Sequence, residues 1–142
     1  MVILKFTLDF QGSEFDPDKI TPLLGEDTVI FDKSEGLQEI KFLSLLPATA
    51  FSVHENAQIH INWFIKFIDT NFLSLVSAKV EDIIFLTEIF YFGAQCNLDI
   101  FNQEFYDAAK RFKLKTPISV YKLNKKEFYS IFKTAEKSFL SN

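Results

Sequence analysis

Apolar and polar positions alternate strictly at the start of the chain and predict a β-strand over Val2–Phe10. Asp16 and Pro17 are residue types that cap and open a helix. Because Pro22 would remove a hydrogen bond from a helix interior, we expect this helix to be short or to restart near Pro22. Gly25 is the residue expected to end it.

The pattern changes to a helical period in the middle of the chain. Apolar residues recur at helical spacing over Ala57–Phe72 and predict the main core helix. Ser52 and Glu55 have the spacing of a capping box, so we expect the helix to begin at Ser52. Trp63 and Phe67 lie on its flank, where they either pack into the core or form an exposed aromatic patch for a partner.

A nearly continuous apolar run predicts a central strand over Ile83–Phe92, covered on both faces. The alternation that follows in Cys96–Phe101 predicts the second strand of a hairpin, with Cys96 as a buried and inert thiol. Glu88 is the one carboxylate inside the apolar run. It either lies at an edge or pairs with a lysine, or it is a buried group with a raised pKa and a functional role.

Shorter signals predict the remaining elements: strands over Thr28–Phe31, Leu37–Leu46 and Thr116–Leu123, a helix capped by Asn102, and a final helix opened by Asn124 and Glu127. Pro117 either restricts its strand to an edge of the sheet or stands at the start of that strand. No linker separates these elements, so we expect a single domain over residues 1–142. The predicted class is α+β, a mostly antiparallel sheet with helices packed on it and a C-terminal helix. Two strand–helix units suggest an internal pseudo-repeat.

Two segments carry a family resemblance. Phe15–Gly25 combines Asp-Pro at a helix start with Leu-Gly after it, and Phe105–Tyr121 combines a helix with a strand that ends in Tyr. With these motifs the chain resembles a mostly bacterial family known as domain of unknown function 4279. The resemblance implies the fold and supplies no catalytic residues. Pro22 and the basic helix after the closing strand depart from the family pattern.

Composition narrows the functional class. The chain has 18 Phe and is 48% hydrophobic, so its core needs neither disulfides nor a metal. The single cysteine, Cys96, fits a reducing cytoplasm. The chain has no phosphate loop, dinucleotide fingerprint or zinc-protease motif, and His54 and His60 would lie on different faces of one helix. We therefore expect no cofactor and no metal, and no apolar run is long enough to span a membrane.

Charge is distributed unevenly along the chain. Met1–Ile40 carries nine acidic residues against three lysines, and Asp107–Asn142 carries nine basic residues against three acidic ones. The two segments either present a charged surface to a partner or neutralise each other. Arg111 is the only arginine and the sequence pI is about 5.2, so we do not expect nucleic-acid binding.

These observations predict a non-enzymatic, cytoplasmic protein-binding protein. The specific hypothesis is a bacterial immunity protein whose acidic surface occludes the active site of a basic toxin, such as a nuclease. The predicted partner-binding residues are Glu14, Asp16, Asp18, Glu26, Asp27, Asp32 and Glu35. One alternative is a small-molecule-binding domain or enzyme with a pocket between the long helix and the sheet, which convergence of Glu88, His60 or Tyr121 would favour. Another is a structural subunit that dimerises through an edge strand or the final helix.

Overall fold

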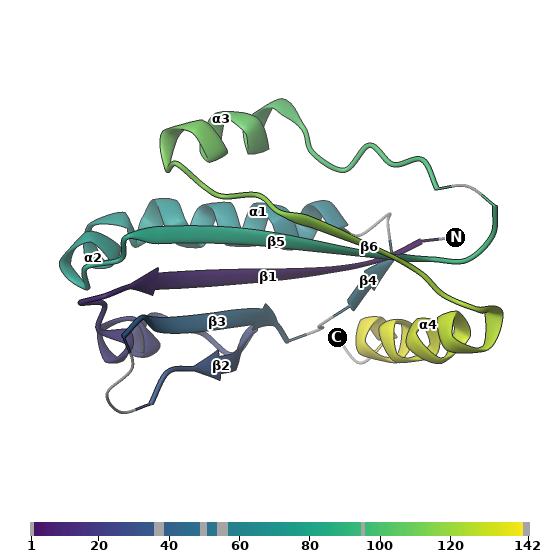
Figure 1. The fold of residues 1–142 in the computed structure, drawn as a ribbon, viewed down its shortest axis with the longest axis horizontal. Helices are drawn as coiled ribbons and strands as arrows, with labels where there is room; N and C mark the ends of the chain where they lie inside the picture. The colour runs from purple at the N-terminus through teal and green to yellow at the C-terminus, as the bar shows by residue number, and fades with distance from the viewer. Residues whose placement is uncertain (1, 36–38, 49–50, 54–56, 95, 141–142) are drawn as a thin grey trace.

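The computed structural model describes residues 2–35, 39–48, 51–53, 57–94 and 96–140, and Figure 1 shows its fold. The elements, in chain order, are β1 (Val2–Gly12), the 3₁₀ helices η1 (Pro17–Lys19) and η2 (Thr21–Leu23), β2 (Thr28–Lys33), β3 (Lys41–Pro47), β4 (Phe51–Val53), α1 (Ala57–Thr70), α2 (Phe72–Ser77), β5 (Asp82–Tyr91), α3 (Gln103–Arg111), β6 (Ile118–Lys122) and α4 (Lys125–Leu140).

The described strands form one sheet in the order β2-β3-β1-β5-β6, and β4 pairs with the start of β1. Every pairing is antiparallel except that of β5 with β6, which is parallel. Helix α1 lies behind the sheet in Figure 1, α3 belongs to the connection between β5 and β6, and α4 lies beside β4. The predicted α+β class, including the C-terminal helix, is confirmed.

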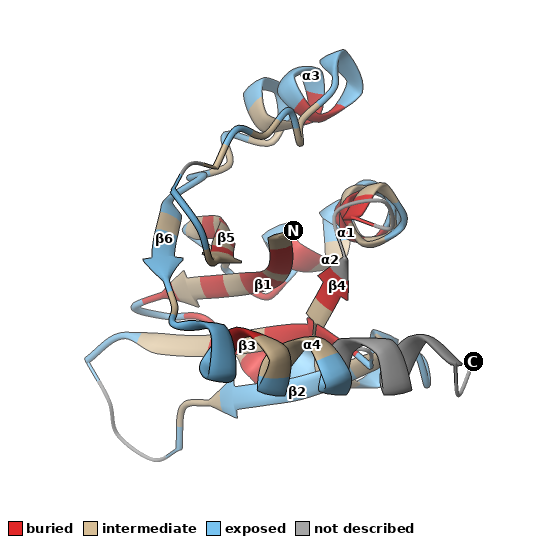
Figure 2. Cartoon of the chain, turned by 90° about the vertical axis from the view of Figure 1, so that its right-hand side faces the viewer, coloured by how far each residue is buried: buried red, intermediate tan, exposed pale blue. Residues whose placement is uncertain are grey.

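The core lies between the sheet and α1, because β1 turns alternate side chains toward that helix. Leu4, Phe6, Leu8 and Phe10 are fully buried. Figure 2 shows the buried positions along β1, β3, β4 and β5 and on the part of α1 that faces them. Full burial of one such side chain contributes roughly 1.5–3 kcal/mol, so this interface makes a large favourable contribution to folding.

Several local signals in the sequence are confirmed. Asn102 Oδ1 accepts a hydrogen bond from the backbone N–H of Phe105 at 2.9 Å, which caps α3. Asn124 and Glu127 cap α4 reciprocally, at 3.0 and 2.9 Å. The interrupted helix expected around Pro22 is observed as the separate turns η1 and η2.

The predicted start of the long helix at Ser52 is wrong. Ser52 is buried in β4 opposite Leu4, so long-range strand pairing outweighs its local capping potential. Residues 54–56, which include His54 and Glu55, lie outside the described residues. The helix also ends earlier than expected, since Asn71 separates α1 from α2 and Phe72 packs on Phe112 instead.

The predicted hairpin strand over Cys96–Phe101 is also wrong. Residues 97–102 have no strand pairing, and β6 occupies the position beside β5 after the crossover through α3. The apolar alternation of the segment is used for packing: Phe101 stacks on Phe105 with ring centroids 4.0 Å apart. Cys96 is half-buried and belongs to no strand.

The structure also answers three smaller predictions, on the start of β3, the burial of β5 and the packing of Trp63. The third strand begins at Lys41, later than predicted, because residues 39–40 form a bend, and residues 36–38 lie outside the described part. The prediction that β5 is covered on both faces is wrong. Ile83, Phe85, Thr87 and Ile89 on one face are buried, whereas the residues between them, on the other face, are only partly buried. Trp63 stacks on buried Phe67 at 5.4 Å, which confirms core packing rather than an exposed patch.

Gly12 ends β1 at a close approach between backbones, and its replacement gives the first prediction. A Cβ at Gly12 would lie 2.7 Å from the carbonyl oxygen of Lys79. We expect Gly12→Ala to lower the free energy of unfolding by about 1–3 kcal/mol, because backbone must move. Gly25→Ala is the control, since its Cβ would meet the side chain of Asp27. Equal losses for the two variants in urea denaturation would contradict this explanation.

Candidate protein-binding site

The acidic segment between β1 and β2 is fixed to the core by apolar residues. Phe15 and Ile20 are fully buried, while Glu14 and Asp18 are exposed and Asp16 is partly exposed. The backbone N–H of Asp16 also donates to the carbonyl oxygen of Ala78 at 3.0 Å. The carboxylates are therefore presented by a segment whose path is set by burial and hydrogen bonding.

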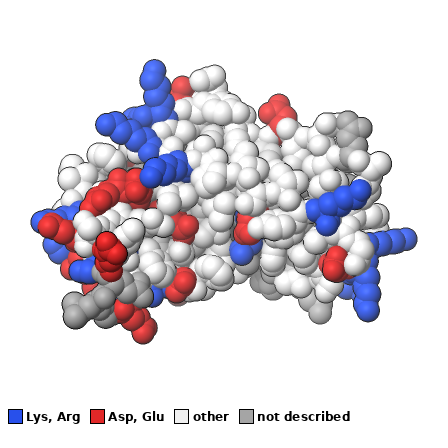
Figure 3. Space-filling model, in the orientation of Figure 1, with Lys and Arg blue, Asp and Glu red and all other residues white. Residues whose placement is uncertain are grey.

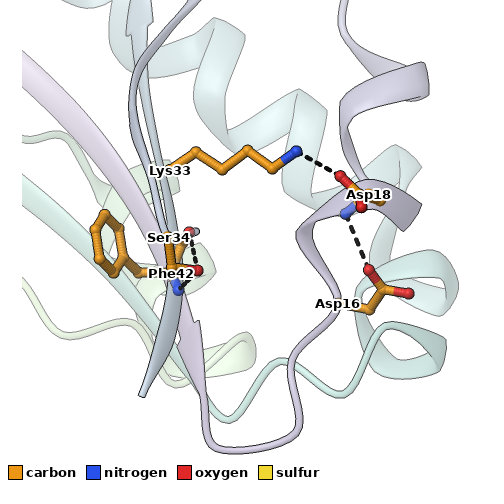
Figure 4. A network of polar contacts seen from close by, with 5 residues as sticks. All are labelled: Asp16, Asp18, Lys33, Ser34 and Phe42. Atoms are coloured by element: carbon orange, nitrogen blue, oxygen red, sulfur yellow. Dashed lines mark hydrogen bonds and ion pairs between the residues drawn. The ribbon is translucent and has the colours of Figure 1, made fainter. Parts of the chain in front are cut away.

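Asp16 and Asp18 lie near the end of β2, as Figure 4 shows. Asp16 Oδ1 accepts a hydrogen bond from the backbone N–H of Asp18 at 3.1 Å and so caps η1. The Lys33 ammonium pairs with Asp18. Ser34 and Phe42 continue the pairing of β2 with β3 through a 3.0 Å backbone bond and a 2.9 Å bond to Ser34 Oγ. Lys33 therefore extends toward η1 from a fixed strand end.

Asp32 belongs to a polar row that crosses the sheet. It pairs in register with Ser44, which pairs with Asp9 of β1. Burial raises the pKa of Asp9, a hydrogen bond with Ser44 lowers it in part, and the charge of Asp32 raises it again. Asp9 Oδ1 is buried with no hydrogen-bond partner among the described residues.

The raised pKa of Asp9 predicts a stability change that depends on pH. Above its folded pKa the carboxylate is charged in both the folded and the unfolded state, and its burial destabilises the fold. Below the ordinary pKa of 3.8 the carboxyl group is neutral in both states, and this cost is absent. We therefore expect Asp9→Asn to stabilise the protein at neutral pH by on the order of 0.5 kcal/mol and to lose that advantage in acid. Thermal unfolding of the natural chain and of Asp9→Asn at neutral and at acidic pH measures this difference in stability. A larger gain in stability from Asp32→Asn, at an exposed position, would contradict the explanation by burial of Asp9.

The other predicted acids are dispersed. Glu14 pairs with Lys79 at 3.0 Å, and this hydrogen bond and charge lower the pKa of Glu14. Glu26 and Asp27 form the exposed turn before β2, about 20 Å along that strand from its other end. Glu35 is exposed just after β2. The structure thus places Asp16, Asp18 and Asp32 at the Lys33 end of β2 and leaves Glu26 and Asp27 apart. Asp32 lies on the sheet face of Ser44 and Asp9, whereas Lys33 lies on the opposite face with Leu43 and pairs with Asp18 there.

Two acids at this end of the sheet were missed by the sequence reasoning. Glu81 Oε1 accepts hydrogen bonds from the N–H and hydroxyl of Ser13, at 3.0 and 2.7 Å, and Asp82 pairs with Lys115 at 2.9 Å. Antiparallel pairing of β1 with β5 sets Gln11 opposite Asp82 and brings these acids to the acidic segment. An explicit prediction of that strand pair would have found them.

Charge remains unevenly distributed in the folded molecule. Figure 3 shows acidic side chains concentrated at the left end, where β1 ends and the η helices lie, with Lys or Arg side chains among them, and mainly basic ones at the right, around the end of β6 and α4. A second basic group lies at the upper left, near the end of α3. Within the described ranges, no ion pair joins a carboxylate of residues 1–40 to a base of residues 107–142. Direct neutralisation of one segment by the other is therefore not observed there.

We call the cluster of Glu14, Asp16, Asp18, Asp32, Glu81 and Asp82 the acidic end. Its exposed carboxylates come from segments that are distant in sequence and are held by the same sheet end. Such a surface can attract a positively charged protein and orient it during the encounter.

The residues proposed for a small-molecule site do not converge. Glu88 pairs with Lys5 at 3.3 Å, with both side chains less than one-fifth exposed. Tyr121 stacks on Phe90 at 5.1 Å, on the same sheet face as Glu88. His60 packs edge-on to Phe6, and burial lowers its pKa. The predicted lysine pairing of Glu88 is therefore confirmed.

An open pocket of about 470 Å³ lies on the opposite, α1-facing side of the sheet. It is lined by Ile89, Tyr91, Ala94, Cys96, Leu98 and Val120. This lining can accept an apolar group and contains no charged side chain. Among the residues that the structure describes, no three His, Cys, Asp or Glu side chains gather to hold a metal ion.

None of the helices in the described ranges combines the length and apolar character needed to cross a membrane. Comparisons of the chain with protein-family models, with curated proteins and with solved structures find no match, so the resemblance to domain of unknown function 4279 stays a prediction.

Proposed function

We propose that the chain is a non-enzymatic binding protein that engages a basic protein partner through the acidic end. In its specific form, the proposal is an immunity protein that covers the active site of a basic, nuclease-type toxin. The observation that carries the proposal is the gathering of exposed carboxylates from the β1–β2 segment, β2 and the start of β5 at one end of the sheet. Charge complementarity of this kind speeds association and selects partners.

The way these carboxylates are held supports binding. Burial of Phe15 and Ile20 and the cap made by Asp16 fix the backbone before any partner arrives, so little ordering entropy is lost on association. Asp18 and Glu14 each have one lysine partner at the surface, with side-chain exposures of 76% and 72%. An incoming arginine or lysine can therefore reach them without breaking a buried pair.

A small-molecule site remains the second candidate because of the 470 Å³ pocket. Its apolar lining suits an apolar group and offers no charged side chain to orient a polar substrate. Binding of a small apolar molecule there, detected as a rise in melting temperature that Ala94→Trp abolishes, would favour this candidate.

Affinity capture from the native lysate tests the proposed function. We expect the tagged chain, at low salt, to retain one stoichiometric basic protein that elutes as salt rises. The double variant D18K/D32K, in which two exposed carboxylates of the acidic end are reversed, is expected not to retain it. Failure to capture any basic protein, or equal capture by the variant, would contradict the proposal.

A further inference from the structure

Strand β6 is an open edge of the sheet. Within the described part of the chain, no strand pairs with its outer side. Its pairing with β5 is regular from Ile118 to Lys122. Ile118 and Val120 are 52% and 57% exposed, so apolar side chains accompany the open backbone. Edges of this kind are templates for an added strand.

Two backbone hydrogen bonds establish which groups of β6 point outward. The carbonyl oxygen of Pro117 accepts from Thr87 at 3.0 Å, and the N–H of Leu123 donates to Tyr91 at 2.8 Å. Since successive residues of a strand direct these groups to opposite sides, those between Pro117 and Leu123 alternate. Residues 118, 120 and 122 therefore direct their N–H and C=O groups to solvent. Pro117 lies on the inner side, so its missing donor does not interrupt the outer edge.

The opposite edge of the sheet is less suitable. Strand β2 has exposed Val29, Ile30 and Phe31, but its register shifts between Ile30 and Asp32. Such a bulge interrupts the alternation of outward donors and acceptors, and natural sheets use bulges to block edge pairing. The regular β6 edge is therefore the better site for strand addition.

The pocket described above lies beside this edge. Val120 pairs in register with Ile89, so both side chains point to the same face, and both line the 470 Å³ pocket. In an added strand, the residue opposite Val120 would point to that face as well. An apolar side chain at that position would lie next to Val120, at the side of the pocket that Val120 lines. Backbone hydrogen bonds along the edge of β6 would then provide affinity, and the pocket would provide specificity for the apolar side chain.

Charge around β6 indicates the partner's chemistry. Lys122, Lys125 and Lys126 are exposed at the end of the strand and the start of α4. Antiparallel pairing of two copies about Val120 would bring their basic ends toward Lys115 of the other copy, which like charges disfavour. An extended segment with acidic residues beside its apolar position complements these lysines.

We propose that β6 and its adjoining pocket bind an extended, acidic segment of another protein as an added strand, with one apolar side chain in the pocket. This site takes a ligand of charge opposite to that proposed for the acidic end and is independent of it. The two surfaces would let the chain bind a basic protein and an acidic segment at the same time.

Selection from a phage-displayed library of random linear peptides on the full chain tests the proposal. We expect enriched peptides to carry an apolar residue flanked by acidic ones. Synthetic copies are expected to bind about tenfold more weakly to Val120→Pro, which removes an outward N–H, and to Lys122→Glu. Methylation of alternate backbone nitrogens in the peptide should weaken binding similarly.

Ala94→Trp provides a test that leaves the β5–β6 pairing intact. Ala94 is exposed and lines the pocket, so the larger side chain fills the pocket and should also weaken binding about tenfold. Leu73→Glu, at an 83% exposed position of α2, is the control and should bind as the natural chain does. Melting curves of every variant exclude unfolding as the cause. The absence of enriched peptides, or peptides that bind Ala94→Trp unchanged, would overturn the proposal. Enrichment of basic peptides that D18K/D32K no longer binds would also overturn it, while supporting the acidic end.

Discussion

Replacing Phe85 by alanine is expected to lower the free energy of unfolding by about 3–5 kcal/mol. Phe85 is 1% exposed in the central strand β5. Its ring centroid lies 5.5 Å from that of Phe6, 5.8 Å from Phe64 and 5.3 Å from Phe105, so it joins β1, α1 and α3. The loss combines the removed burial with the cavity left behind, and it is a large share of the stability of an ordinary domain.

Urea denaturation of Phe85→Ala measures this effect, and Phe90→Ala is the matched control. Phe90 lies on the other face of the same strand, is half-buried and stacks on exposed Tyr121. We expect the control to lose clearly less stability, because its neighbours can relax into the space. A loss as large as that of Phe85→Ala would show that the core does not lie between the sheet and α1.

Reversing Asp18 and Asp32 together is expected to weaken binding of the basic partner by about 100-fold or more. Close charge pairs at interfaces contribute about 1.5–7 kcal/mol each, and reversal replaces attraction by repulsion. Asp18 and Asp32 are exposed, and neither contributes a buried side chain to the core. Isothermal titration of the captured partner against D18K/D32K measures the change.

Glu104→Lys with Asp107→Lys is the matched control for that experiment. It makes the same change in net charge at two exposed positions of α3, outside the acidic end. We expect this control to keep most of the affinity, since steering depends on where charge lies as well as on its sum. Equal losses in both double variants would show that net charge alone governs binding.

Much of the fold follows from local patterns in the sequence. The alternation in Val2–Phe10 predicts β1, and Asn102 and Asn124 mark two helix starts that the structure confirms. The failures lie where distant segments compete with a local signal. Ser52 has the spacing of a helix cap, but it belongs to β4, which pairs with β1. The Cys96–Phe101 segment alternates without forming a strand, because β6 occupies the position beside β5.

The candidate site was only partly predictable for the same reason. The sequence identifies Asp16 and Asp18 as loop carboxylates, yet their position near Lys33 depends on how η1 packs against the β2–β3 hairpin. Glu81 joins them through the pairing of β1 with β5. Neither arrangement is encoded in residue spacing, which is why Glu26 and Asp27 were grouped with acids that lie elsewhere.

The dissociation constant of the complex with the captured basic partner, measured as salt concentration rises, tests the central claim most directly. If the acidic end is the binding surface, affinity falls steeply with salt for the natural chain, and D18K/D32K binds weakly at every salt concentration. An affinity that does not change with salt and is retained by D18K/D32K would contradict binding through the acidic end.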